Sequence, residues 1–363
     1  MSTPPDVETV VIGAGPAGAT AATVLARAGR SVLLVDKAVF PRDKCCGDGL
    51  TARALRELER LGLEPSAVAS WRVVDRVAVR SPSGTERRYP LPEGPGYHAA
   101  VARRADLDAA LIDLATAAGA RVRQGAGFTA ARPQADGIEI DIAGLGTVRA
   151  NHVIGADGMW SPLRKALGLT VDGYRGEWHA FRQYFSGVAP RAGAELIVWF
   201  ERDLLPGYAW SFPLADGRAN VGFGIQRGGR VPVGDMKQLW ADLLGRPHIR
   251  AVLGPDARPE APHKAWPIPA RIGRVPLIGP RALFVGDAAA ATDPMTGEGI
   301  GQAVLTGRLA AEAIIDHPEP YEHYQRAVLA ELVADDRMAR LLVPLLARPN
   351  VARAALRLTG ATP

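Results

Sequence analysis

The chain has 363 residues, of which 47% are hydrophobic, and its 43 basic and 38 acidic side chains give a net charge of +5. This length allows one large or two ordinary domains with a substantial core. The basic residues form no long block and do not alternate with aromatic residues, so we expect no nucleic-acid partner. The seven histidines lack the spacing of metal ligands and no Gly-x-Ser-x-Gly motif occurs, so neither a metal site nor a simple hydrolase is predicted.

The sequence predicts a cytoplasmic protein. Its first eight residues, MSTPPDVE, lack the basic and apolar pattern of a secretion signal. Cys45 and Cys46 are the only cysteines, and because they are adjacent they could form only a strained bridge. No apolar run approaches the roughly 18 residues that a membrane span requires.

The C-terminal segment 336–358 mixes leucines with arginines and has no acidic residue after Asp336. Such a segment could lie peripherally at the inner face of the cytoplasmic membrane. It could instead be a helix that covers the core while its arginines reach water, which is the interpretation we favour. Pro344 and Pro349 are expected to break any long continuous helix in this segment.

The first forty residues contain a complete strand–helix–strand unit that ends at Asp36. Gly13 permits a tight turn, Gly15 lets the backbone approach a pyrophosphate, and Gly18 lets the helix pack closely on the strand. Asp36 stands where a carboxylate would bind a ribose hydroxyl, and the adjacent Lys37 is assigned to the same site. This pattern predicts a dinucleotide site but does not separate FAD from NAD.

Further along the chain, α/β segments alternate with β-rich segments. Helices are predicted over 51–63, with leucines at 55, 58 and 61, and from residue 104 to Gly119, where a strand follows. Hairpins are predicted around the turns at 81–85 and 215–218. A strand, a Gly/Pro-rich loop and a long Ala-rich helix follow from residue 281 onward.

Two more glycine–acid motifs, VIGADGMWSPLR (153–164) and LFVGDAAAATDPMTGEGI (283–300), each follow a buried-type strand. With the first motif they resemble the flavoprotein superfamily of p-hydroxybenzoate hydroxylase. The resemblance implies that Asp287 holds the ribityl chain of FAD, that Arg104 meets its phosphate side, and that Asp157 lies near the dinucleotide. It assigns four more residues to the cofactor site: Gly286, Pro294, Gly299 and Ile300. An isolated aspartate of this kind would more often be a capping or turn residue.

By this resemblance the predicted fold is α/β, with a Rossmann-type FAD-binding domain, an inserted antiparallel β-sheet domain for the substrate, and C-terminal helices. The FAD-binding domain is assigned residues 1–70, 98–175 and 270–320. The sheet domain is assigned residues 71–97 and 176–269, and the C-terminal helical segment residues 321–363. Only one Rossmann fingerprint occurs, so a nicotinamide donor would bind transiently.

Two other motifs resemble the geranylgeranyl reductase family, including its menaquinone-reducing relatives. The first is a Cys-x-x-Gly turn, here Cys46, Gly47, Asp48 and Gly49, preceded by Pro-Arg-Asp-Lys. The second is Tyr-x-Trp-x-Phe-Pro followed by Gly-x-Gly, here Tyr208, Trp210, Phe212, Pro213, Gly222 and Gly224. The family resemblance covers roughly residues 5–315 and makes these six residues candidate substrate contacts.

The physical properties of both motifs allow a second reading. Tyr208, Trp210 and Phe212 share one face of a strand and could line an apolar slot, but aromatic strands are usually sheet core. Glycines 222 and 224 would leave room for a thin substrate. Cys46 could face the flavin, or could be a small buried packing residue.

The resemblance implies an FAD-dependent oxidoreductase that reduces isolated C=C bonds of an isoprenoid chain by hydride from reduced flavin N5. The external reductant would be NADPH, NADH or a reduced ferredoxin or flavodoxin, which would be a protein partner. Cys46, Tyr208 and Trp210 are the catalytic candidates, and the proton source is left open between Cys46, Tyr208 and the flavin.

Other activities share the same framework. A flavin monooxygenase or halogenase would act on an aromatic or polyene substrate, and halogenases carry a Trp-x-Trp-x-Ile-Pro element that resembles residues 208–213. Tyr208 and Phe212 depart from that element. A cyclase that uses flavin without net turnover is a third possibility.

Overall fold

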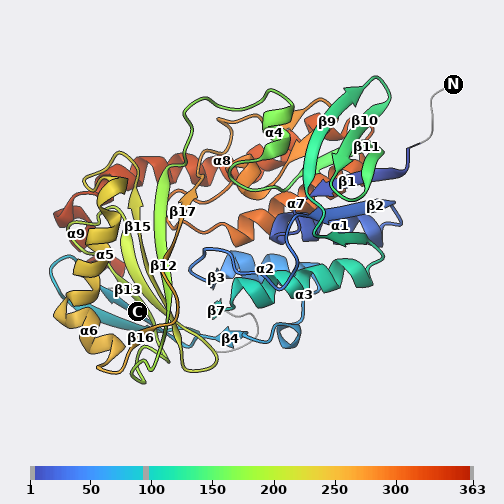
Figure 1. Ribbon diagram of the computed structural model, residues 1–363. Coiled ribbons are helices and arrows are strands. Elements are labelled where there is room, and N and C mark those ends of the chain that lie inside the picture. The colour runs from blue at the N-terminus through green and yellow to red at the C-terminus, as the bar shows by residue number, and fades with distance from the viewer. Residues whose placement is uncertain (1–4, 93–97, 360–363) are drawn as a thin grey trace.

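The computed structural model describes residues 5–92 and 98–359, and Figure 1 shows two large sheets side by side with α8 lying across both. The architecture is the predicted one: an α/β nucleotide-binding part, a second and mainly antiparallel sheet, and C-terminal helices. Strands from 76–90 and from 178–268 join one sheet. The exact domain boundaries stay a prediction, and their parts at 1–4, 93–97 and 360–363 lie outside the described residues.

The first sheet has a parallel centre, with strand order β18-β19-β11-β1-β2-β8. A β9–β10 hairpin extends it antiparallel from β11. These strands are β1 (Val7–Ile12), β2 (Val32–Asp36), β8 (Arg121–Gln124), β9 (Phe128–Gln134), β10 (Gly137–Ile142), β11 (Gly146–Gly155), β18 (Ile278–Gly279) and β19 (Ala282–Phe284). The carboxyl ends of the parallel strands meet along one edge, where open α/β sheets bind ligands.

Small residues let the helices of this part pack closely. The helices are α1 (Pro16–Arg27), α3 (Arg104–Ala117) and α7 (Ile300–Asp316), and α1 packs against the other two. A Cβ at Gly18 would lie 1.9 Å from the carbonyl oxygen of Gly13, and one at Gly307 would lie 2.2 Å from that of Ala17. The missing side chains at Gly18 and Gly307 therefore let α1 pack directly against the turn after β1 and against α7.

The second sheet has strand order β16-β12-β15-β14-β13-β5-β6, with β17 paired to β12. All its pairs are antiparallel except β5 with β13. Its strands are β5 (Arg76–Arg80), β6 (Glu86–Pro90), β12 (Trp178–Ser186), β13 (Leu196–Trp199), β14 (Tyr208–Pro213), β15 (Ala219–Gln226), β16 (Arg258–Pro259) and β17 (Lys264–Ile268). Helices α5 (Met236–Gly245) and α6 (Pro247–Leu253), which our sequence analysis missed, pack on one face.

A small three-stranded sheet connects the two large ones. It contains β3 (Gly49–Thr51), β7 (Ala99–Val101) and β4 (Arg72–Val73), with β7 in the centre. Helix α2 (Ala52–Leu61) follows β3 and buries the predicted leucines 55, 58 and 61. Short helical turns lie at η1 (Pro65–Ala67), η2 (Val233–Asp235) and η3 (Gly286–Ala289), and helix α4 (Pro162–Ala166) follows β11.

The C-terminal segment is more continuously helical than the sequence predicted. Helix α8 (Pro320–Leu346) continues through Pro344, and α9 (Pro349–Thr359) begins at Pro349. The helix is interrupted between Leu346 and Pro349, as expected for Pro349, but the expectation was wrong for Pro344. Pro344 lies in the last turn of α8, where the missing backbone N–H removes a single hydrogen bond to the preceding turn and the helix continues to Leu346. In the part of the chain that the structure describes, no helix is long and apolar enough to cross a membrane.

Candidate active site

One cavity of about 1020 Å³ runs from the edge of the first sheet to the face of the second. Most of the residues chosen from the sequence line it: Gly13, Gly15, Asp36, Lys37, Cys46, Arg104, Asp157, Tyr208, Trp210, Phe212, Gly224, Gly286, Asp287, Gly299 and Ile300. Gly18, Pro213, Gly222 and Pro294 are not part of its lining. The two groups of motifs therefore meet in a single space.

The α1 end of the cavity is built to receive an anion. Gly15 is the N-cap of α1, so the free N–H groups of the first turn point outward there. An added Cβ at Gly15 would lie 3.8 Å from Nη2 of Arg42 and 3.9 Å from Nη2 of Arg104. The buried Asp108 holds both guanidinium groups, at 2.8 Å from Arg104 Nε and 3.0 Å from Arg42 Nη1. Arg42 and Asp108 were not identified from the sequence.

Asp36, the residue predicted to bind the ribose, lies at the end of β2. One carboxylate oxygen of Asp36 accepts from the N–H of Ala14 at 2.8 Å and the other from the N–H of Ala38, also at 2.8 Å. These bonds hold the carboxylate against the glycine turn, beside the adjacent Lys37. Gly13 in that turn has φ of +101°, a left-handed conformation that glycine adopts without strain.

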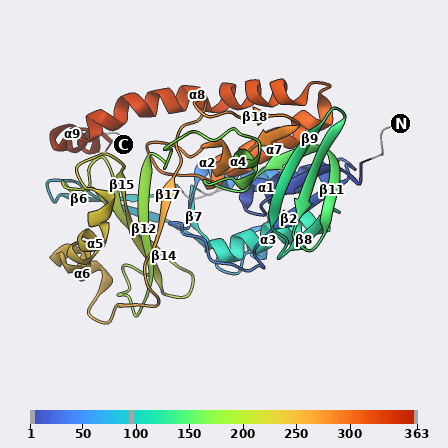
Figure 2. The ribbon, with the colours of Figure 1, turned by 45° about the horizontal axis from the view of Figure 1, so that its top comes forward.

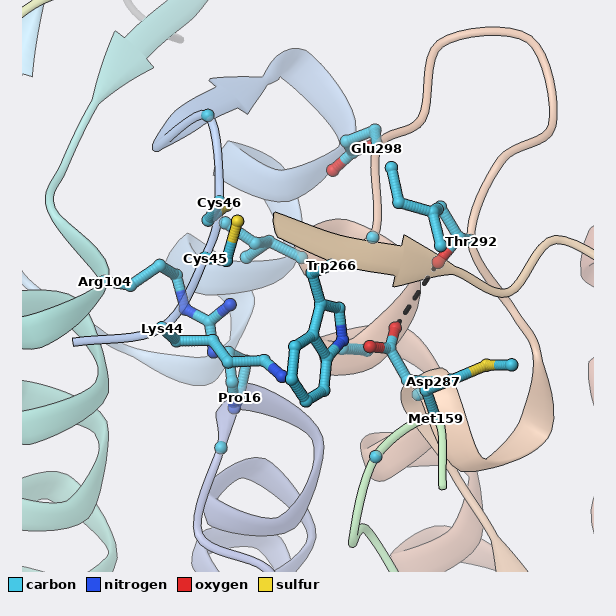
Figure 3. Close-up of a pocket in the computed structure, with 18 of the residues that line it drawn as sticks. Pro16, Lys44, Cys45, Cys46, Arg104, Met159, Trp266, Asp287, Thr292 and Glu298 are labelled. Atoms are coloured by element: carbon cyan, nitrogen blue, oxygen red, sulfur yellow. Dashed lines mark hydrogen bonds between the residues drawn. The ribbon is translucent and has the colours of Figure 1, made fainter. Parts of the chain in front are cut away.

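The other two predicted aspartates differ in what they bind. The Asp157 carboxylate accepts from Ser161 Oγ at 2.6 Å and from the N–H of Leu163 at 2.9 Å, so it caps the turn that starts α4. Its burial raises its pKa. Figure 3 shows the Asp287 carboxylate near Thr292, whose Oγ1 lies 3.4 Å from Asp287 Oδ1. Asp287 is thus the better placed of the two to bind a ligand in the cavity.

The Cys-x-x-Gly turn packs directly on the aromatic strand. A Cβ at Gly49 would lie 2.9 Å from Phe212 Cε2, and one at Gly47 would lie 3.5 Å from Trp210 Nε1. Glycine is therefore the residue that lets this turn approach the rings. Ring centroids along the strand are 6.0 Å apart, both from Tyr208 to Trp210 and from Trp210 to Phe212. The stripe lies on the cavity side of β14, not in the core under α5 and α6.

Asn220, on β15, connects the cysteine turn with the aromatic strand. Its amide nitrogen donates to the carbonyl oxygen of Cys46 at 2.9 Å and to Asp48 Oδ2 at 2.8 Å. Its amide oxygen accepts from Trp210 Nε1 at 3.1 Å. Tyr184 donates its hydroxyl to the same Asp48 oxygen at 2.7 Å. Neither Asn220 nor Asp48 was assigned a role from the sequence, because their connection exists only in the folded sheet.

Burial raises the pKa of the Cys46 thiol, so the group stays protonated at neutral pH. Its sulfur accepts from the N–H of Asp48 at 3.3 Å. Burial also raises the pKa of Tyr208, to about 12, and its hydroxyl donates to the carbonyl oxygen of Thr296 at 2.5 Å. Cys45 also lines the cavity, and burial raises its pKa to about 11.

Lys44 and Trp266 also line the cavity and were missed by the sequence analysis. Figure 3 shows the Trp266 ring between Lys44 and Asp287, and Lys44 Nζ lies 3.3 Å from the ring centroid. Burial lowers the pKa of Lys44 to about 8. Lys44 is part of the Pro-Arg-Asp-Lys stretch, which was the only sequence signal for this pair.

These features fit a flavin adenine dinucleotide. The α1 N-terminus with Arg42 and Arg104 suits the diphosphate, Asp36 suits the adenosine ribose, and Asp287 lies further along the cavity. The chemistry that FAD supplies when bound and reduced is hydride transfer.

Comparison with known proteins agrees with this reading. A family model described as an FAD binding domain matches residues 6–315. Menaquinone reductase from Mycobacterium tuberculosis is 37% identical, over 86% of this chain and 78% of the relative. Digeranylgeranylglycerophospholipid reductase 2 from Methanopyrus kandleri is 34% identical, over 85% of this chain and 76% of the relative.

Solved structures share the fold at lower identity. A geranylgeranyl bacteriochlorophyll reductase-like protein from Thermoplasma acidophilum has a TM-score of 0.77 at 22% identity, covering 94% of this chain and 91% of that one. The halogenase PltM, as a mutant in complex with FAD, has a TM-score of 0.78 at 19% identity, covering 95% and 78%. The chain belongs to the FAD-binding, p-hydroxybenzoate hydroxylase-like flavoprotein family, as an FAD oxidoreductase of the geranylgeranyl reductase type.

Proposed function

We propose that this protein reduces isolated C=C bonds in the isoprenoid chain of a prenylquinone or prenyl lipid, using FAD that an external donor has reduced. The observation that carries the proposal is the joining of two motifs in one cavity. The Cys46 turn packs on the aromatic strand through Asn220, and this cavity continues to the nucleotide-binding end. A prenyl substrate is supported by the names of two relatives, a menaquinone reductase and a digeranylgeranylglycerophospholipid reductase, each about a third identical in sequence to this chain.

The aromatic stripe suits an apolar chain. Tyr208, Trp210 and Phe212 line the cavity, and the strand that carries them, YAWSFP, has no charged residue. Rings of this kind bury large apolar area and exclude water from an alkene. The cofactor residues proposed from the sequence, with Arg104 and Asp287 foremost, would bind FAD at the other end.

Cys46 is our candidate for the proton donor. Reduction of a C=C bond requires a hydride at one carbon and a proton at the other. Cys46 is partly buried, and desolvation raises the pKa of its thiol, so the thiol carries its proton at neutral pH. Giving up that proton would leave a thiolate, which water entering after turnover would reprotonate. Tyr208 is less suited as the proton donor, because its hydroxyl already donates a hydrogen bond to the carbonyl oxygen of Thr296.

The electron donor would be NADPH, NADH or a reduced ferredoxin or flavodoxin. A substrate held in a bilayer would bring the protein to the face of a membrane. No protein partner is needed for hydride transfer itself if a nicotinamide is the donor.

The test is turnover of the purified holoenzyme with a panel of menaquinone-type and geranylgeranyl substrates under anaerobic conditions. A reductase yields product that is heavier by about 2 mass units for each bond reduced. The competing functions, monooxygenase or halogenase, rest on a fold shared with the halogenase structures. They would give no product until oxygen is admitted, and then a hydroxylated or halogenated one. A cyclase would give product without consuming reductant.

A further inference from the structure

The outward side of the last turns of α8 is apolar. Among the described residues ten large hydrophobic side chains are exposed, and Met338, Leu341, Leu342, Leu345 and Val351 are five of them. Leu341 is 73% exposed and Met338 is 58% exposed. We call Met338, Leu341, Leu342 and Leu345 the outer apolar face. Their spacing of three and four residues puts them on one side of the helix.

The opposite side of the same helix is fixed to the protein body. Arg340 forms a two-bond ion pair with Asp336, at 2.6 and 2.9 Å, and donates to the carbonyl oxygen of Ala270 at 2.9 Å. Val343 is buried and packs with Trp178 and Ile268, both of which line the cavity. The outer apolar face is therefore held outward, one helix away from the substrate cavity.

Figure 2 shows α8 along one edge of the molecule, with α9 at its end beside the second sheet. The face consequently lies at the periphery, where an extended surface can reach it. Apolar side chains on the periphery of a soluble protein mark an interaction site when they cluster.

The charge around the face indicates its occupant. Arg337 and Arg348 are exposed beside it, and the 27 residues after Asp336 contain five arginines and no acidic residue. Basic residues beside an exposed apolar helix face match the surface of an anionic bilayer. A second copy docked symmetrically on the same face would bring these arginines together, so self-association is disfavoured.

We propose that the outer apolar face, with Arg337 and Arg348, docks this protein on the surface of an anionic lipid bilayer. The purpose of this docking rests on the proposed function, since a prenyl lipid or prenylquinone resides in the bilayer. Docking through α8 would hold the cavity wall at Trp178 and Ile268 close to the bilayer that contains the substrate.

The test measures co-sedimentation of holoenzyme with vesicles of phosphatidylglycerol and phosphatidylcholine, and with vesicles of phosphatidylcholine alone. The variant replaces two leucines together, Leu341→Gln and Leu345→Gln. Leu145→Gln is a matched control, because Leu145 is 41% exposed and Leu345 is 42% exposed, and Leu145 lies in the turn between β10 and β11. FAD content and the melting temperature of each variant establish that it is folded.

We expect wild type to bind the anionic vesicles, the Leu145→Gln variant to bind equally, and the double variant to bind at least about tenfold more weakly. Equal binding by the double variant, or no binding by wild type, would overturn the proposal. A dimer that the double variant abolishes would also overturn it in favour of self-association.

The same variants separate this inference from the proposed function. With a short-chain prenyl substrate dissolved in water, the double variant should turn over at the wild-type rate. If wild type binds vesicles but reduces no prenyl substrate, the docking surface stands and the proposed function fails.

Discussion

Replacing Gly222 by alanine tests whether the aromatic strand is packed as tightly as the structure indicates. A Cβ at Gly222 would lie 2.3 Å from Trp210 Cζ2 and 2.3 Å from the carbonyl oxygen of Phe181. Carbon contacts are favourable only at about 3.5 to 4.0 Å, so the Trp210 ring must move by roughly 1 Å or more toward the cavity. Overpacking of this kind costs about 1–3 kcal/mol in the free energy of unfolding. The shift would also strain the bond from Trp210 to Asn220, which holds the Cys46 turn.

Gly224→Ala is the matched control on the same strand. Its Cβ would lie 3.9 Å from the nearest atom, the carbonyl oxygen of His179, so we expect unchanged or slightly raised stability. Urea unfolding of both holoenzymes, followed by tryptophan fluorescence, measures the difference, and turnover rates measure its effect on the site. If Gly222→Ala unfolds at the wild-type urea concentration and reduces substrate at the wild-type rate, the tight packing of Trp210 on Gly222 is refuted.

Three further changes test other parts of the site. Arg104→Ala should weaken FAD binding to the apoprotein by roughly 10- to 100-fold, because a charged donor beside Gly15 is lost; unchanged affinity in a flavin fluorescence titration would contradict this. Tyr208→Phe should keep most of the activity, since its hydroxyl serves Thr296, and a loss of about a hundredfold or more would instead make Tyr208 the proton donor. Burial raises the Asp48 pKa from 3.8 to about 6, so folding favours the protonated carboxyl. As pH rises from about 4 to above 6, deprotonation of Asp48 therefore lowers the free energy of unfolding of wild type by roughly 3 kcal/mol in total. Asp48→Asn cannot titrate, so the free energy of unfolding of wild type relative to that of the variant should fall across this pH range. Parallel stability curves would count against the assignment.

The nucleotide-binding part was predictable because its constraints are local. Gly13 needs a left-handed φ, and Gly18 leaves no room for a Cβ, so the glycine spacing alone defines the turn and the helix that follows. The strand ending at Asp36 and the helix α1 match the sequence prediction. Such positions accept few other residues, and this makes the pattern informative.

The second sheet was predicted less completely. Helix α5 carries Met236, Leu239, Trp240 and Leu243 at helical spacing, a signal that was present in the sequence and not used. These side chains cover the sheet face opposite the cavity. The alternation of side chains along β14 could not show which face of the strand packs in the core and which lines the cavity, because that depends on where α5 and α6 pack.

The connections within the site could not be read from the sequence. Asn220 lies 172 residues from Asp48, and Lys44, in the segment between β2 and β3, contacts Trp266 on β17. Each residue by itself is ordinary, and only the tertiary fold brings the pairs together. The motifs located the site, but its hydrogen-bond network required the structure.

The central claim is that this cavity would hold an isolated C=C bond beside the flavin site, where reduced FAD would supply a hydride and Cys46 a proton. The most direct measurement is an anaerobic single turnover, in which enzyme reduced with dithionite meets a menaquinone-type prenylquinone and flavin absorbance is followed beside product mass. We expect one reduced bond for each flavin reoxidised, and a slower reaction in Cys46→Ala despite normal FAD content. Flavin that stays reduced until oxygen enters, followed by an oxygenated product, would instead indicate a monooxygenase.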